Sequence, residues 1–150
     1  GALGGFCFDP DRHSEPLVLI SAGSGITPMM AISRFLKDTG RTNPCTMLYG
    51  ARTQADIIFH DECRKLAAEH AGFRYVVSLT QPDSSWTGEV GRIDFERVKR
   101  FVPNLVACRY FLCGPNEFMD ELRAALIDAG VPEERVHTEQ FHAVTAPATV

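Results

Sequence analysis

Hydrophobic residues in this chain gather in short runs, and each run is followed by a longer stretch in which polar residues interrupt them. Residues 17–20 form an unbroken aliphatic run, which is typical of a strand buried on both faces of a sheet. From Pro28, apolar residues recur at helical spacing until Gly40, which predicts an amphipathic helix with proline at its first position. The two segments predict a strand followed by a helix that packs on the sheet.

The same order of strand and helix repeats along the chain. Further strands are predicted at residues 46–49, 73–79, 110–113 and 136–138. Further helices are predicted from Phe59 to Gly72, from an N-cap at Asp94 to Phe101, and from an N-cap at Asn116 to Gly130. Because helices separate the strands, we expect parallel strands joined by right-handed crossovers. The sequence therefore predicts an α/β fold, a doubly wound five-stranded parallel sheet with helices on both faces.

The segment after the first predicted strand has the composition of a phosphate-binding turn. Residues 23–28 read Gly-Ser-Gly-Ile-Thr-Pro, and ligands of open parallel sheets bind beyond the carboxyl ends of the strands. The two glycines allow the backbone to approach a phosphate, and the N-terminus of the following helix favours an anion. We interpret the segment as a pyrophosphate-binding loop, with an ordinary strand-to-helix turn as the alternative.

Two other strand ends carry candidate chemistry. The fourth predicted strand ends in Cys113-Gly114-Pro115, where glycine permits close approach and the cysteine presents a small side chain. The fifth is followed by Glu139 and Phe141, which places a carboxylate beside the same crevice. Taken singly, Cys113 reads as a small buried apolar residue and Glu139 as a solvated carboxylate.

Taken together, these motifs resemble a known family. In order and spacing, they resemble the C-terminal NAD(P)-binding domain of the ferredoxin-NADP reductase superfamily. The segments that carry the resemblance are GSGITP, YGARTQADIIF, SWTGEVGRI, FLCGPNEFM and HTEQF. Within it the chain is most similar to NADH-dependent reductase components of oxygenases and to the reductase domains of flavohaemoglobins. The resemblance implies a pyridine-nucleotide-binding domain at residues 16–142, the tail of an FAD-binding barrel at residues 1–15, and the start of a linker at residues 143–150.

The resemblance also implies roles for individual residues. The pyrophosphate would lie on the loop of Gly23, Ser24, Gly25, Thr27 and Pro28. Catalytic roles at the nicotinamide fall to Cys113 and Glu139, with Gly114 and Pro115 beside them and Phe141 against the flavin. The implied reaction is hydride transfer from NADH to FAD, with electrons passing on to a ferredoxin-like iron-sulfur or haem acceptor. FAD would be bound mainly by a domain outside this sequence, so the isolated domain is expected to be inactive.

The choice between NADH and NADPH depends on the end of the third predicted strand. Family members that prefer NADPH commonly carry Ser-Arg there, whereas this chain has Ser78-Leu79. Without the arginine a 2'-phosphate lacks its partner, so we predict NADH. Ser78 and Gln81 are candidate ligands of the adenosine ribose. Arg52 and Arg74 keep NADPH as a possibility.

Composition excludes several classes of function. The net charge is −4 and no basic cluster is visible, so nucleic acid is not an expected partner. The longest uncharged stretch, residues 16–33, contains glycines and a proline, so we expect no transmembrane segment. No signal peptide opens the sequence, and the five cysteines lack CxxC spacing, so we expect a cytoplasmic protein without a metal site.

Other interpretations remain open. The same fold serves non-catalytic nucleotide-binding or response-regulator-like interaction modules, but no aspartate ends the first or third predicted strand, where a phosphoacceptor pocket would be built. A thiol-redox protein would need a second cysteine near Cys113, and Cys108 lies at the other end of the predicted strand. Trp86, in the polar loop of residues 80–92, either stacks on a ligand or fixes the loop to the sheet.

Overall fold

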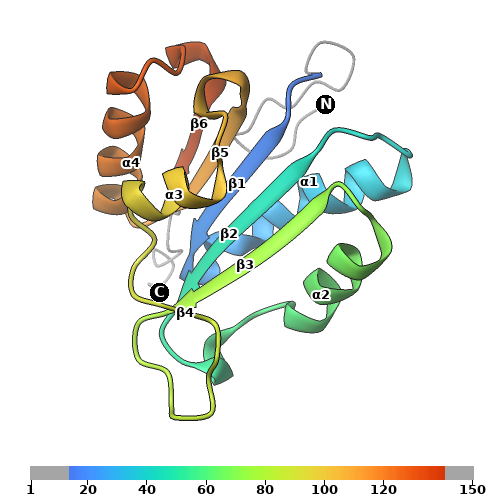
Figure 1. The fold of residues 1–150 in the computed structure, drawn as a ribbon, viewed down its shortest axis with the longest axis vertical. Helices are drawn as coiled ribbons and strands as arrows, with labels where there is room; N and C mark the ends of the chain where they lie inside the picture. Colours follow the sequence, from blue (N-terminus) through green and yellow to red (C-terminus); the bar gives the residue numbers. More distant parts are fainter. Residues whose placement is uncertain (1–13, 141–150) are drawn as a thin grey trace, which may run out of the picture.

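A computed structural model describes residues 14–140, which form a single parallel sheet with helices on both faces (Figure 1). The strands lie in the order β4-β3-β2-β1-β5-β6, and every neighbouring pair is parallel. The strands are β1 (Leu17–Ala22), β2 (Cys45–Ala51), β3 (Phe73–Leu79), β4 (Glu89–Val90), β5 (Arg109–Gly114) and β6 (Val136–Gln140). The helices are α1 (Ile26–Asp38), α2 (His60–Glu69), α3 (Phe95–Phe101) and α4 (Asn116–Asp128).

The doubly wound α/β fold is confirmed, but the predicted number of strands is wrong. The sheet has six strands because the two-residue strand β4 pairs with Ser78 and Leu79 at the end of β3. A strand of two residues shows no hydrophobic period, so the pattern of the sequence could not reveal it.

Side chains of the central strands alternate between two cores. In β1, Leu17 and Leu19 pack with residues of α1 and α2, whereas Val18 and Ile20 pack with residues of α3 and α4. Both faces are therefore covered by helices, as Figure 1 shows, and this explains the unbroken aliphatic runs. Each fully buried Leu or Ile contributes roughly 1.5–3 kcal/mol through removal from water.

Helix starts agree with the sequence at one cap and differ at two. Asp94 caps α3 as predicted, because its carboxylate accepts a hydrogen bond of 2.9 Å from the backbone N–H of Arg97. The prediction of Asn116 as a cap is wrong, since Pro115 occupies the N-cap position and Asn116 is the first residue of α4. Helix α1 begins at Ile26, so Pro28 is its third residue. There, too, its missing N–H breaks no helical hydrogen bond.

The predicted barrel tail and C-terminal linker fall almost entirely outside the described residues, and Phe141 does so as well. Within residues 14–140, no helix is both long enough and apolar enough to cross a membrane.

Candidate nucleotide-binding site

A pocket of about 550 Å³ opens at the carboxyl ends of the strands. Its walls are the segments that follow β1, β2, β3, β4 and β5, represented by Gly23, Arg52, Thr80, Arg92 and Pro115. The chain leaves β1 toward β2 on one side and later returns to place β5 on the other, so the pocket lies at the topological switch point of the sheet. Its volume is in the range of small-molecule and cofactor sites.

The turn between β1 and α1 presents an open backbone to this pocket. Gly23 has φ of +61° and nothing lies within 4 Å of where a Cβ would stand. Ser24 and Thr27 are exposed. No side chain caps α1, and its first turn has no acidic residue. The first N–H groups of α1 therefore have no side-chain acceptor, which is the arrangement that binds anions.

Gly25 has a packing role that the sequence did not indicate. Its φ is −62°, so any residue tolerates the backbone conformation, but an added Cβ would lie 2.3 Å from the carbonyl oxygen of Cys113. Gly25 is therefore required for packing of the turn against β5. Gly114 is required for a different contact, because its added Cβ would lie 2.9 Å from the Phe118 ring of α4 and 3.3 Å from the Cβ of Ala22.

Cys113 and Glu139 are adjacent, as the sequence suggested. They occupy paired positions in the register of β5 and β6, and neighbouring in-register positions of parallel strands point to the same face. Cys113 is 1% exposed, and burial, reinforced by the charge of Glu139, raises the pKa of its thiol to about 11. The thiol is thus neutral near pH 7 and is a weak nucleophile. Neither side chain lines the pocket, which reaches this side of the sheet at Pro115.

Residues 19–124 match the oxidoreductase NAD-binding domain family. The chain belongs to this family. It is 34% identical over 87% of its length to the stachydrine N-demethylase reductase subunit of Rhizobium meliloti. It is 36% identical over 87% of its length to a flavohaemoprotein of Deinococcus radiodurans. These matches confirm the resemblance found in the motifs.

Solved structures agree with the family assignment. The flavohaem-like FAD/NAD-binding domain of nitric oxide dioxygenase from Vibrio cholerae has a TM-score of 0.79 and 29% identity, covering 92% of this chain and 55% of that one. The chain spans only 37% and 33% of the lengths of the two curated relatives. The part of these proteins that it matches is the oxidoreductase NAD-binding domain. The match favours this assignment over a response-regulator-like module.

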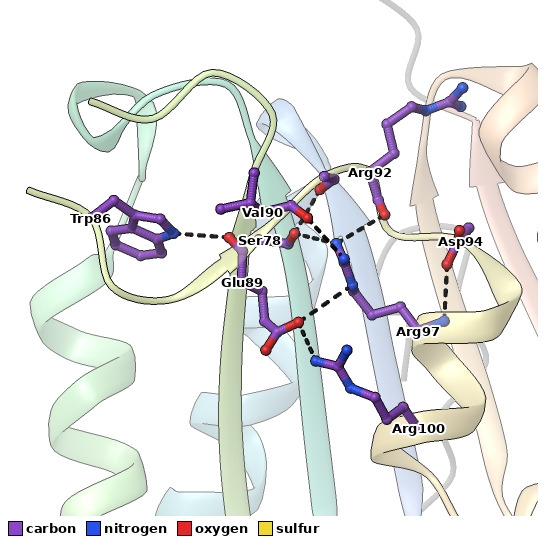
Figure 2. A network of polar contacts seen from close by, with 9 residues as sticks. Ser78, Trp86, Glu89, Val90, Arg92, Asp94, Arg97 and Arg100 are labelled. Atoms are coloured by element: carbon purple, nitrogen blue, oxygen red, sulfur yellow. Dashed lines mark hydrogen bonds and ion pairs between the residues drawn. The ribbon is translucent and has the colours of Figure 1, made fainter. Parts of the chain in front are cut away.

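Within this NAD-binding domain, the two predicted ribose ligands stand apart from the pocket. Ser78 is fully buried, and its hydroxyl donates a 2.6 Å hydrogen bond to the carbonyl of Gly91 and accepts one from Arg97 (Figure 2). A hydroxyl that is buried and doubly engaged is not available to a ribose, so this role of Ser78 is corrected. Gln81 is exposed but does not line the pocket, whereas Thr80 does.

The sequence did not predict that the segment after β4 forms a wall of the pocket. Gly91, Arg92 and Ile93 line the pocket of the NAD-binding domain. The signal was present in the motif SWTGEVGRI, but only the pairing of β4 with β3 shows that its last residues line the same pocket as Gly23 and Ser24. The described residues contain no cluster of three or more His, Cys, Asp or Glu that could hold a metal.

Proposed function

We propose that this domain binds NADH across the carboxyl edge of the sheet and presents its nicotinamide to FAD held by a separate flavin-binding domain. Bound FAD would accept the hydride and pass electrons singly to an iron-sulfur or haem acceptor. The observation that carries the proposal is the pocket at the switch point, lined by Gly23 and Ser24 of the glycine turn, which leads into the uncapped helix α1. The family assignment supports the same ligand.

The dinucleotide pyrophosphate is proposed to lie on the Gly23 turn. The open space over Gly23 lets phosphate oxygens approach the backbone, and Thr27, in the first turn of α1, is exposed beside them. An anion at a helix N-terminus is stabilised by about 0.3–2 kcal/mol, depending on its burial. Gly25 and Pro28 act indirectly in this arrangement, by fixing the path of the turn.

The nicotinamide is proposed to lie toward β5 and β6, at Cys113, Gly114 and Glu139. Hydride transfer is mainly a problem of placing two rings in contact, so the neutral, buried Cys113 supplies shape and not a nucleophile. Glu139 would face the nicotinamide and flavin, together with Phe141 of the following segment.

NADH is proposed in preference to NADPH. Leu79 is fully buried at the end of β3, and Ser78 is engaged with Arg97, so neither offers a contact to a 2'-phosphate. Arg74 stacks on the Phe101 ring at 4.9 Å and is not among the residues lining the pocket.

The remaining parts of the reductase are inferred from the relatives. The chain covers about a third of the flavohaemoprotein, whose name includes its haem. We infer that residues 1–15 continue from an FAD-binding barrel and that the acceptor is a ferredoxin-like or haem protein or domain. We also infer a cytoplasmic location, because the four described cysteines are all free, as expected in a reducing compartment.

The test is titration calorimetry of the domain with NADH, NADPH and ADP-ribose. The informative variant is Gly23→Asp, which introduces a carboxylate where the phosphate should lie. Gly40→Asp is its matched control, because Gly40 also has a positive φ, +66°, with nothing within 4 Å of an added Cβ.

We expect saturable binding of ADP-ribose and NADH, weakened at least about tenfold by Gly23→Asp and unchanged by Gly40→Asp. Absence of binding at millimolar concentration, or equal effects of the two variants, would contradict the proposal.

A further inference from the structure

Two arginines line the nucleotide pocket without a partner among the described residues. Arg52 follows β2 and Arg92 follows β4, and both are exposed and belong to the pocket wall. Neither side chain makes an ion pair or a hydrogen bond with another residue in the part of the chain that the structure describes. Asp56 also lines the pocket, but its carboxylate accepts hydrogen bonds of 3.1 and 2.9 Å from Thr53.

Two arginines of the neighbouring helix α3, by contrast, have partners. Arg97 forms an ion pair with Glu89 at 3.6 Å, and Arg100 also pairs with Glu89. In Figure 2 the guanidinium groups of Arg97 and Arg100 point into this network, whereas the side chain of Arg92 projects away from it. The difference distinguishes structural arginines from one that is available to a ligand.

Arg97 fixes the backbone from which Arg92 projects. Its guanidinium donates to the carbonyl of Val90 at 2.8 Å and to the carbonyl of Arg92 at 3.1 Å. Gly91 lies between them with φ of +119°, and a Cβ on it would approach the guanidinium to 3.3 Å. The segment therefore wraps closely around Arg97, and the direction of the Arg92 side chain follows from this contact.

We propose that Arg52 and Arg92 both bind the pyrophosphate of the dinucleotide, and that Arg97 is the positioning residue for Arg92. This inference rests on the proposed function. The pyrophosphate is favoured over a 2'-phosphate because both arginines share one pocket with Gly23 and Ser24 of the phosphate turn. Guanidinium groups bind phosphate oxygens through charge-assisted hydrogen bonds.

The experiment measures dissociation constants of the domain for ADP-ribose, NADH, NADPH and adenosine. The variants are Arg52→Met and Arg92→Met, which keep a long side chain but remove the charge. Arg123→Met is the matched control, because Arg123 lies on α4 outside the pocket and pairs with Glu133 at 2.8 Å. Thermal unfolding of each variant verifies that it is folded.

We expect Arg52→Met and Arg92→Met each to weaken ADP-ribose, NADH and NADPH by about tenfold or more, by the same factor for each ligand, and to leave adenosine unchanged. Arg123→Met should change none of them. The effects should diminish in high salt, because screening weakens the phosphate contact. Unchanged affinities, or equal weakening of adenosine, would overturn the proposal. Weakening of NADPH alone would replace the pyrophosphate with the 2'-phosphate and overturn it as stated.

The role of Arg97 is tested by a double-mutant cycle. Arg97→Lys should weaken ADP-ribose in the wild-type background but have little further effect once Arg92 is already methionine, because it acts through Arg92. Additive effects would show that Arg97 does not act through Arg92.

Failure of this inference is distinguishable from failure of the proposed function. Only the arginine assignment fails if the wild-type domain binds ADP-ribose, Gly23→Asp weakens that binding and the arginine variants leave it unchanged. If wild-type domain does not bind ADP-ribose, both fail.

Discussion

At the scale of single residues, two glycines of one turn do different work, and the sequence could not separate them. Both belong to a Gly-Ser-Gly motif, and the motif alone suggested that both approach a phosphate. Gly23 has a positive φ and faces open space. At Gly25 a side chain is excluded because the backbone of Cys113 occupies the place where its Cβ would stand. The distinction depends on β5, which is about ninety residues away in the chain.

This difference predicts unequal effects of alanine substitution on the free energy of unfolding. Gly25→Ala should destabilise the domain by about 2 kcal/mol or more, because the Cβ would contact backbone that cannot move freely. Gly23→Ala should cost only about 1 kcal/mol, the usual penalty of a left-handed conformation. Urea unfolding of both variants measures the comparison. A larger loss for Gly23→Ala would show that the turn is not packed against β5 as described.

The buried cysteines predict alkaline destabilisation. Burial raises the pKa of Cys45 and of Cys63 to about 12 and that of Cys113 to about 11. Their contribution to stability is complete below the pKa of about 9 in the unfolded chain, and it is lost as pH rises toward the folded values. Each thiol lowers the free energy of unfolding by about 1.4 kcal/mol per pH unit in that window.

Urea unfolding between pH 8 and pH 11 measures this loss. In Cys45→Ala, the free energy of unfolding should fall less steeply with pH, by about 1.4 kcal/mol per pH unit, because one buried thiol is missing. This expectation does not depend on how much the substitution destabilises the domain at pH 8. An unchanged slope would mean that Cys45 ionises as easily in the folded protein as in the unfolded chain.

At the scale of elements, prediction succeeded for the strands of five or more residues and failed for the strand of two residues. β1 and β5 are buried at nearly every position because helices cover both faces, which explains their continuous hydrophobic runs. The predicted bounds of β3 were those observed. β4 has two residues, one of them exposed, and exists because Leu79 and Ser78 offer it a partner. The pocket wall formed by Gly91 and Arg92 could not be predicted for the same reason, since its position depends on that pairing.

Trp86 anchors the loop that leads into β4, which resolves the two interpretations of this residue. Its indole N–H donates a 2.8 Å hydrogen bond to the carbonyl of Glu89, and its ring packs against the core on the α2 side. Trp86→Ala should therefore increase hydrogen exchange at the amide of Gly91, which bonds to Leu79 at 2.9 Å. Trp86→Phe keeps most of the packing and should have the smaller effect. Equal exchange in all three proteins would show that β4 forms without the anchor.

At the scale of the whole molecule, a group of charges joins the beginning of the described chain to its last strands. Arg109, only 8% exposed, donates to both carboxylate oxygens of Glu15 at 3.1 and 3.2 Å. It also donates to the carbonyl of Glu134 and contacts Nε2 of His137 at 2.8 Å. Since a guanidinium has only donors, Nε2 of His137 is the acceptor in this contact. The contact ties the segment before β1 to β5 and β6, the strands that carry Cys113 and Glu139.

This arrangement predicts a pH-dependent contribution of Glu15 to stability. The hydrogen bonds from Arg109 hold the pKa of Glu15 below its usual value, so the stabilisation is present above the ordinary pKa and is lost as pH falls through the folded value. At pH 7, Glu15→Gln should destabilise the domain by about 1.5–3 kcal/mol, as for a hydrogen bond to a charged partner, and the difference should shrink toward pH 3. Glu133→Gln removes a carboxylate whose side chain is 72% exposed and should change stability by less than about 1 kcal/mol. Urea unfolding at both pH values measures the free energy of unfolding of each variant. Equal losses for the two variants would mean that the Glu15 contact is no stronger than a surface ion pair. The contact would then not fix the chain where it enters the sheet.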